Sequence, residues 1–212
     1  VSTLEANGYL DRSPATRKYR LGLKLVERSS VLLKQIEVRK VAVPLLERLR
    51  ERCGESVNLG IRDGVEVVYV EQLPSLHPLG TRDEVGKRAS VHCTALGKAL
   101  LAWLPEGEVE RLVGRCDLRA MTPNTITDAE QFRRELEMTR ERGYAVDDEE
   151  VELGVRCVSA PVFDHAGRVV AAVSVSAPVP RMPVEQIPHL AERVRQTAKG
   201  ISTRLGYPER PY

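Results

Sequence analysis

The sequence lacks the cysteine patterns and the long apolar runs that would place it in a specialised class of protein. Its four cysteines, Cys53, Cys93, Cys116 and Cys157, are scattered without CxxC spacing, so they indicate neither a disulfide framework nor a zinc ribbon. No apolar run is long enough to cross a membrane, and the first residues do not resemble a signal peptide. We therefore expect a cytoplasmic protein with reduced thiols and no membrane partner.

The motifs of the common catalytic sites are also missing. The sequence contains no Gly-x-Ser-x-Gly nucleophile elbow, no Walker loop and no dinucleotide-binding glycine fingerprint. An enzyme would have to use Cys93 or Cys157 as nucleophile and His92 or His165 as base. Neighbouring residues of an extended segment point to opposite faces, so His92 and Cys93 cannot easily act as a pair. We expect that the protein is not an enzyme.

The formal net charge of only +2 excludes a strong overall attraction to nucleic acid. The 212 residues, 42% hydrophobic and 29% charged, are typical of a globular protein with one large core or two small ones. Residues 1–40 are more basic, with nine lysines and arginines against four acidic residues. Any attraction to DNA is therefore expected to be local and to lie near the N-terminus.

Residues 1–22 have the order of elements found in the second half of a winged helix-turn-helix. The segment Leu4–Leu10 has the pattern of a helix end closed by a glycine, and the strand-like pieces Tyr9–Arg12 and Lys18–Leu21 follow it. Residues that break secondary structure fill the turn between them. The side chains that such a wing would lay along DNA phosphates are Arg12, Arg17, Lys18 and Arg20. An ordinary hairpin with a solvated, charged face is the alternative at this point.

The rest of the chain alternates between helical and strand patterns. Residues 21–52 have helical spacing, which predicts a linker helix to about Gln35 and then a second helix, with a kink or restart at Pro44. Further helices are expected at Thr94–Leu104, Glu106–Arg115, Asp128–Arg142 and Pro183–Leu205. Strands are expected at Ser56–Arg62, Val65–Gln72, Tyr144–Val146, Val155–Phe163 and Val169–Ser176. Helices between hairpins indicate an α+β domain whose antiparallel sheet is covered by helices.

Five blocks of the sequence are informative together, although each is weak alone. They are Leu4–Leu10, Tyr19–Gly22, His92–Ala102, Arg142–Glu150 and Gly154–Asp164. With these blocks in this order and spacing, the chain resembles the IclR family of bacterial transcriptional regulators over nearly its whole length. The resemblance implies a GAF-like α+β effector domain, with an antiparallel sheet flanked by helices, preceded by a partial winged helix-turn-helix and a linker helix.

The resemblance also implies a domain organisation and partners. The expected boundaries are 1–22 for the C-terminal part of the winged helix-turn-helix, 23–36 for the linker helix, 37–206 for the effector domain and 207–212 for a disordered tail. The first helices of the family's DNA-binding domain do not occur in this sequence, so we expect operator DNA to be bound specifically only through a complete N-terminal domain. Family members form dimers through the N-terminal region, often paired into tetramers, and many respond to small organic acids.

Two serines are candidates for binding such an effector. Ser174 and Ser176 have the spacing that sends two strand hydroxyls to the same face, where they can bind a carboxylate or a carbonyl. Without the resemblance, small residues beneath a helix are the simpler interpretation. With it, an effector site is favoured.

The start of a predicted helix is a second candidate for effector binding. Ala95 and Leu96 open this helix, and free backbone N–H groups at a helix start attract anions. The loop with Leu79 and Thr81 is expected to close the other side of the pocket, and Gly97 to let the backbone approach the ligand. Lys98 is expected to point away from the pocket, towards Glu84.

Three more pocket residues follow from the resemblance, which places an effector-contacting acid at Asp147 and pocket-lining side chains at Val155 and Cys157. Without the resemblance, an acidic run is usually a solvated loop. A free cysteine is then as readily interpreted as a buried core residue as a pocket-lining one. Facing a ligand carboxylate, Asp147 would have to be protonated, bridged by water or bonded to a ligand hydroxyl. Arg156 points the other way and is expected to pair with the acidic run 147–150.

A metal- or thiol-based sensor on the same fold is the alternative function. It would use His92, Cys93, Asp147 and Cys157, whose spacing gives no support for a metal site. We therefore predict a DNA-binding transcriptional regulator, with no metal or cofactor, that senses a small carboxylate metabolite. Because the chain has few aromatic residues, an aliphatic acid is favoured over an aromatic one. Binding is expected to order residues 79–94 and 147–157 and to change the packing of the linker helix.

Overall fold

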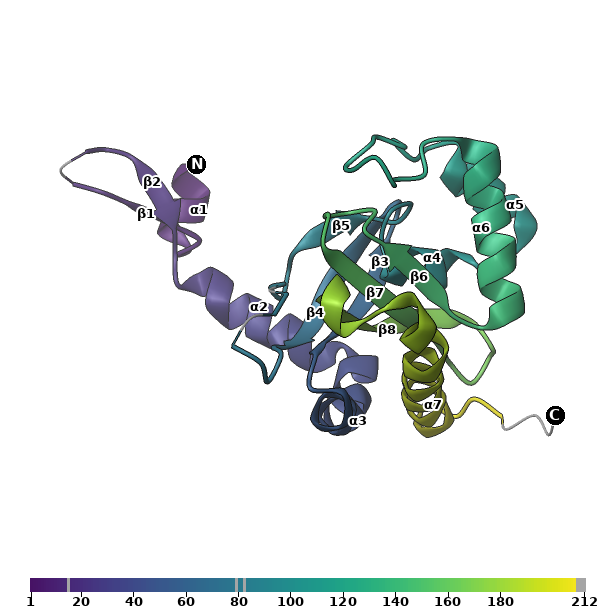
Figure 1. Ribbon diagram of the computed structural model, residues 1–212. Helices are drawn as coiled ribbons and strands as arrows, with labels where there is room; N and C mark the ends of the chain where they lie inside the picture. The colour runs from purple at the N-terminus through teal and green to yellow at the C-terminus, as the bar shows by residue number, and fades with distance from the viewer. Residues whose placement is uncertain (15, 79, 82, 209–212) are drawn as a thin grey trace. The chain divides into compact units, whose positions relative to one another are not determined.

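A computed structural model describes residues 1–14, 16–78, 80–81 and 83–208 (Figure 1). The chain divides into two compact units, Val1–Lys40 and Val41–Tyr212. Among the described residues, no helix is both long enough and apolar enough to cross a membrane.

The N-terminal unit has the predicted order of a helix followed by two strands. Helix α1, Ser2–Ala6, ends before Gly8, whose φ of +74° suits glycine at this turn. Strands β1, Leu10–Arg12, and β2, Tyr19–Leu21, then pair in antiparallel register. Helix α2, Lys24–Gln35, completes the unit together with the first residues of α3.

The predicted end of the linker helix at about Gln35 is confirmed, whereas the helix does not restart at Pro44. The break between α2 and α3, Glu37–Cys53, lies at Ile36, which has extended geometry with ψ of 96°, and Pro44 lies inside α3. A proline in a helix interior costs about 3 kcal/mol because it removes one backbone hydrogen bond. Leu46 and Leu49 are buried from the same helix, and each such leucine contributes about 1.5–3 kcal/mol. Packing of the helix therefore offsets the cost of the proline.

The C-terminal unit is built on a six-stranded antiparallel sheet with the order β5-β4-β3-β8-β7-β6. Its strands are β3 Ser56–Asp63, β4 Glu66–Leu73, β5 Arg88–Ser90, β6 Ala145–Asp148, β7 Val155–Phe163 and β8 Val169–Pro178. The hairpin between β3 and β4 turns at Gly64, with φ of +62°, as the Asp-Gly pair predicts. The short strand β5 was not predicted.

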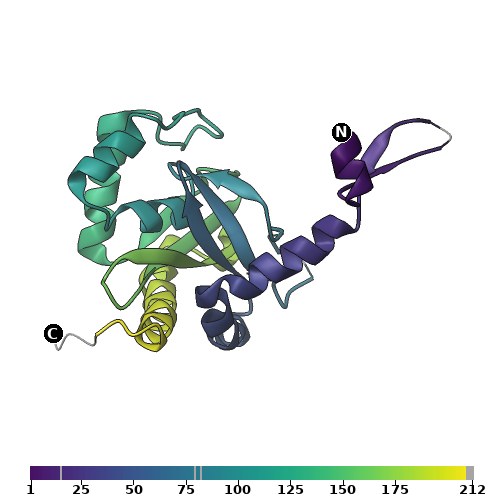
Figure 2. The ribbon, with the colours of Figure 1, turned by 180° about the vertical axis from the view of Figure 1, so that it is seen from behind.

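Helices cover both faces of this sheet. Helix α4, Ala95–Leu101, packs against the central strands and against α6, Ala129–Arg142, which also contacts α5, Glu106–Val113. Helix α7, Ile187–Arg204, packs on β7 and β8, and its Gly200 lies beside Leu45 of α3. Figures 1 and 2 show α4 and α7 on opposite sides of the sheet. Short 3-10 turns, Val179–Arg181 and Val184–Gln186, connect β8 to α7.

Several helix ends are where the sequence predicts them. Thr94 caps α4 by accepting a hydrogen bond from the Gly97 N–H, and Asp128 caps α6 in the same way through Gln131. Helix α4 nevertheless ends at Leu101 rather than Leu104. At the C-terminus, Tyr207 stacks on Phe163 with ring centroids 5.0 Å apart, so the expected disordered tail does not begin at 207. Residues 209–212 lie outside the described part of the chain.

Candidate functional site

The sheet has one apolar face and one face with a polar centre. Val158 and Val175 oppose each other on β7 and β8, and both are fully buried. One residue along these strands, side chains point to the other face, and there the register aligns Asp147 with Cys157 and Cys157 with Ser176. The central strands thus carry a row of carboxyl, thiol and hydroxyl groups across one face.

A cavity of about 450 Å³ lies over this polar row. The predicted effector residues that line it are Thr81, Ala95, Leu96, Asp147, Val155, Cys157, Ser174 and Ser176. Leu79, the ninth predicted residue, lies outside the described residues. The lining residues that the sequence did not reveal include Tyr69, Asp83, Lys87 and Glu152. The structure therefore brings the described candidates together around one cavity.

One wall of the cavity is the start of α4. Thr94 Oγ1 accepts a hydrogen bond from the N–H of Gly97. The N–H groups of Ala95 and Leu96 have no acceptor within the helix. The predicted approach of the backbone to a ligand at Gly97 stays a prediction, and the structure shows a packing role for this glycine. A Cβ atom at this position would lie 2.3 Å from the Cα atom of Val91, so only glycine lets α4 approach that segment.

The two serines are hydrogen-bonded by a residue that the sequence did not single out. Asn58 on β3 is fully buried, and its amide donates to Ser174 Oγ at 3.5 Å and to Ser176 Oγ at 3.4 Å. The same amide donates to Asp83 at 3.2 Å. The amide has two N–H protons for these three acceptors, so the serines share its donation. A serine hydroxyl that accepts from Asn58 keeps its own proton for another acceptor. The pairing of β3 with β8, which sequence alone does not give, creates this contact.

Asp147 is buried at the edge of the cavity, and its Oδ1 accepts a hydrogen bond from the backbone N–H of Glu150 at 2.8 Å. Burial raises its pKa from 3.8 to about 7, and the charge of Glu150 acts in the same direction, while Lys98 opposes both. The carboxyl group is therefore poised between its two protonation states at neutral pH.

The thiols and the histidine have no catalytic arrangement. Burial raises the pKa of Cys93 to about 12 and that of Cys157 well above its usual value, so both remain thiols at neutral pH. His92 contacts Ser90 Oγ through Nδ1 at 2.6 Å and the carbonyl oxygen of Arg119 through Nε2 at 3.1 Å. It is thus engaged away from the two cysteines. Among the described residues, no group of three His, Cys, Asp or Glu side chains is placed to hold a metal ion.

Behind the cavity, Lys98 is almost fully buried and binds Glu150, not Glu84 as the sequence suggested. Its Nζ also donates to the carbonyl oxygen of Val146 at 2.8 Å. Burial raises the pKa of Glu150, while the charge of Lys98 opposes this shift. The prediction for Arg156 is confirmed, since it pairs with Asp148 in the acidic run, with Nη2 and Oδ1 2.6 Å apart.

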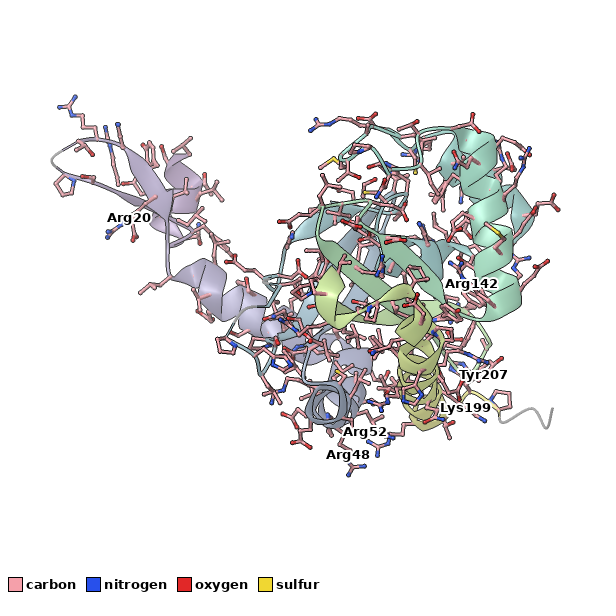
Figure 3. All side chains as sticks on the ribbon, in the orientation of Figure 1. Arg20, Arg48, Arg52, Arg142, Lys199 and Tyr207 are labelled. Atoms are coloured by element: carbon pink, nitrogen blue, oxygen red, sulfur yellow. The ribbon has the colours of Figure 1, made fainter. Side chains whose placement is uncertain are left out.

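The basic side chains of the wing, Arg12, Arg17, Lys18 and Arg20, are all exposed. Arg20 lies 3.4 Å from Asp11 on the paired strand, and the Arg12 guanidinium lies 5.8 Å from the centre of the Tyr19 ring. Arg20 is one of the residues labelled in Figure 3. Their contact with DNA phosphates stays a prediction.

A polar cavity of this size over the sheet can hold a small molecule, and comparison with known proteins identifies the class of protein. Residues 30–203 match the family described as "Bacterial transcriptional regulator IclR C-terminal". The chain is 40% identical over 208 residues to the HTH-type transcriptional regulator XynR of Escherichia coli K12, covering 98% of this chain and 82% of that protein.

Solved structures agree with this match. The structure of Thermotoga maritima IclR is 37% identical, with a TM-score of 0.85, covering 97% of this chain and 83% of that one. The C-terminal domain of E. coli KdgR is 32% identical, with a TM-score of 0.74, covering 81% of this chain and all of that domain. The chain therefore belongs to the IclR family of bacterial transcriptional regulators, as the sequence motifs and the fold class predict. It is a regulator rather than an enzyme.

Proposed function

We propose that the C-terminal unit senses a small aliphatic carboxylate in the cavity over β7 and β8, and that this ligand controls operator binding by the complete protein. The observation that carries the proposal is the hydrogen bonding of Ser174 and Ser176 by Asn58. A serine hydroxyl that accepts from Asn58 can donate its proton to a ligand, and two neighbouring hydroxyls suit an acceptor with two oxygens, such as a carboxylate. The first N–H groups of α4 add donors on the adjacent wall.

The aliphatic character follows from the lining. Tyr69 is the one aromatic residue among the described residues that border the cavity, and burial raises the pKa of its hydroxyl, which stays neutral. Leu96 and Val155 supply apolar surface, and a cavity of about 450 Å³ suits a small metabolite. A flat aromatic acid would find little stacking surface there.

Asp147 sets a condition on the ligand. Two ionised carboxylates repel each other in a buried site, so the ligand carboxylate is bound beside a protonated Asp147, or Asp147 accepts a hydrogen bond from a ligand hydroxyl. A pKa of about 7 makes the protonated form accessible at neutral pH. Short hydroxy acids satisfy both arrangements.

The proposed domain boundaries are those predicted from the sequence. Residues 1–22 form the end of the winged helix-turn-helix, 23–36 the linker helix, 37–206 the effector domain and 207–212 the tail, and the protein acts as a dimer or tetramer. The boundary between the compact units falls inside α3, between Lys40 and Val41, so one helix belongs to both units. Ligand binding shifts the population of α3 packing states and hence the spacing of paired DNA-binding domains.

A thermal-shift panel of short aliphatic acids and their primary amides tests the effector class. An acid that binds the folded chain raises the melting temperature by mass action, whereas its amide does not. Ser174→Ala should abolish the shift, while Ser159→Ala, on the same sheet face but outside the cavity lining, should retain it. If amides stabilise the chain as well as acids do, the carboxylate proposal fails.

Hydrogen exchange tests the transmission step separately. With a bound acid, amide protons of residues 80–94 and of α2 and α3 should exchange at changed rates. If exchange slows around the cavity and stays the same in α2 and α3, the effector assignment survives and the proposed route to the DNA-binding domains does not.

A further inference from the structure

A second cavity of about 790 Å³ lies between α6 and α7, and none of its lining residues also lines the effector cavity. Strand β6 pairs with β7 only as far as the Ala145–Ser159 pair, so the last residues of β7 border this groove beyond the end of β6. Figure 3 labels Arg142, Tyr207 and Lys199 along the same side of α7. All of these residues belong to the C-terminal unit.

Aromatic side chains are concentrated in this groove. Trp103, Phe163 and Tyr207 line it, in a chain with one tryptophan and two phenylalanines. Trp103 meets Phe163 edge to face with centroids 6.1 Å apart, and Phe163 stacks on Tyr207. All three rings are only partly buried, so apolar ring surface faces solvent inside a concave site.

The charges around these rings are mainly positive. Four basic residues, Arg140, Arg142, Arg195 and Lys199, line the groove against two acidic ones, Glu141 and Glu192.

Two of the four basic residues, Arg140 and Arg195, have positive charge that can attract an anionic ligand. Arg140 bonds only carbonyl oxygens among the described residues, those of Ala102 and Leu104. Its positive charge is thus not neutralised by a carboxylate. Arg195 makes an exposed contact of 3.2 Å with Glu192, the kind of pair that contributes little and is easily exchanged for another anion.

We propose that this groove is a second ligand site and that its ligand is a planar aromatic carboxylate. The ring packs against the Trp103–Phe163–Tyr207 cluster, and the carboxylate is held by Arg195 from α7 and by the positive charge of Arg140 from α6. The rings favour an aromatic carboxylate over an aliphatic acid, because an aliphatic acid stacks poorly. The basic residues favour it over a neutral aromatic compound, because such a compound forms no ion pair with them.

The fold connects the two sites. Helix α4 contributes Ala95 and Leu96 to the effector cavity, and the carbonyl of Ala102 just after its end holds Arg140 of the groove. Strand β7 contributes Cys157 to the first site and Phe163 to the second. Occupation of the groove therefore acts on two elements that also shape the effector cavity.

The test uses the fluorescence of Trp103, the only tryptophan, which reports on the groove directly. Benzoate titrated into the chain should give a saturable change in emission and a matching isotherm by calorimetry. Cyclohexanecarboxylate keeps the charge but lacks an aromatic ring, and benzamide keeps the aromatic ring but lacks the charge. Each should bind about tenfold more weakly than benzoate.

Two arginine variants on α7 locate the benzoate. Arg195→Glu should weaken benzoate binding about tenfold, because it replaces an attractive charge by a repulsive one. Arg204→Glu, an exposed change on the same helix outside the groove, should leave binding unaffected, as should Ser174→Ala in the effector cavity. The proposal is overturned if benzoate gives no saturable signal, if both arginine variants behave alike, or if Ser174→Ala abolishes the signal.

Discussion

Asp147 on β6 lies directly opposite Cys157 on β7, and both side chains line the same cavity. The neighbour that the sheet gives to this buried carboxyl group is therefore a thiol rather than a cation. The charge of Lys98 lowers the pKa of Asp147, but its ammonium group binds Glu150 and the backbone of Val146. Burial without a dedicated counter-charge is what leaves the pKa of Asp147 at about 7.

Carboxylate binding should depend on pH through Asp147. Below the pKa of about 7 the neutral group tolerates a ligand carboxylate, and above it the ionised group repels one. Affinity for a short aliphatic acid should therefore fall about tenfold per pH unit above neutrality, as measured by calorimetry. Asp147→Asn should remove this dependence while retaining binding. A wild-type affinity that stays constant from about pH 6 to about pH 8 would falsify the role given to Asp147.

The same group should make the stability of the ligand-free chain depend on pH. Its folded-state pKa is raised, so its stabilising contribution is complete below the unfolded value of 3.8 and is lost as pH rises through about 7. Relative to wild type, Asp147→Asn should gain stability between about pH 5 and about pH 8 in urea denaturation. An equal difference at both pH values would contradict the shifted pKa.

Asn58→Asp should reverse the polarity of the serine pair. An aspartate accepts the protons of Ser174 and Ser176 instead of leaving them to the ligand, and it adds a buried negative charge. Affinity for the acid should fall about a hundredfold. Asn58→Ala, which carries no charge, should lose about tenfold and serves as the test if the aspartate variant does not fold. Unchanged binding in either folded variant would show that Asn58 does not orient the hydroxyls.

The buried pair of Lys98 and Glu150 should behave as a unit. Lys98→Met leaves the carboxylate of Glu150 without its partner and should cost about 3–5 kcal/mol of unfolding free energy. Adding Glu150→Gln removes the unpaired charge and should recover most of this loss. Urea denaturation of the three proteins measures the effect, and a double variant no more stable than Lys98→Met would argue against a charge pair.

Gly97→Ala should destabilise the chain by about 3 kcal/mol, because the new methyl group meets the backbone of Val91 and α4 must move. Gly107→Ala is the matched control, since nothing lies within 4 Å of a Cβ atom at that helical position. It should be neutral or slightly stabilising. Equal melting temperatures for the two variants would refute the close approach of α4.

Local signals account for the parts of the fold that the sequence predicts. Asp63–Gly64 marks a hairpin, and Thr94 and Asp128 mark helix starts, because turn and cap chemistry depends on neighbours along the chain. The helix does not restart at Pro44, because a local rule takes no account of the packing of α3. Strand β5 is too short to leave a pattern and exists through its pairing with β4.

The candidate site divides in a similar way. The resemblance predicts Asp147 from its position in a motif, and strand spacing predicts Ser174 as a candidate. Both residues line the same cavity. Asn58 and the partner of Lys98 depend on contacts across 116 and 52 residues of sequence, respectively. Strand order decides such contacts, and it cannot be obtained from periodicity.

The most direct test of the account is calorimetric titration of the acid that gives the largest thermal shift into wild type and into the Ser174→Ala/Ser176→Ala variant. We expect a single saturable site in wild type and at least about a hundredfold weaker binding in the variant, because both donors are lost. Equal affinities in the two proteins would place the carboxylate elsewhere and would contradict its binding by Ser174 and Ser176.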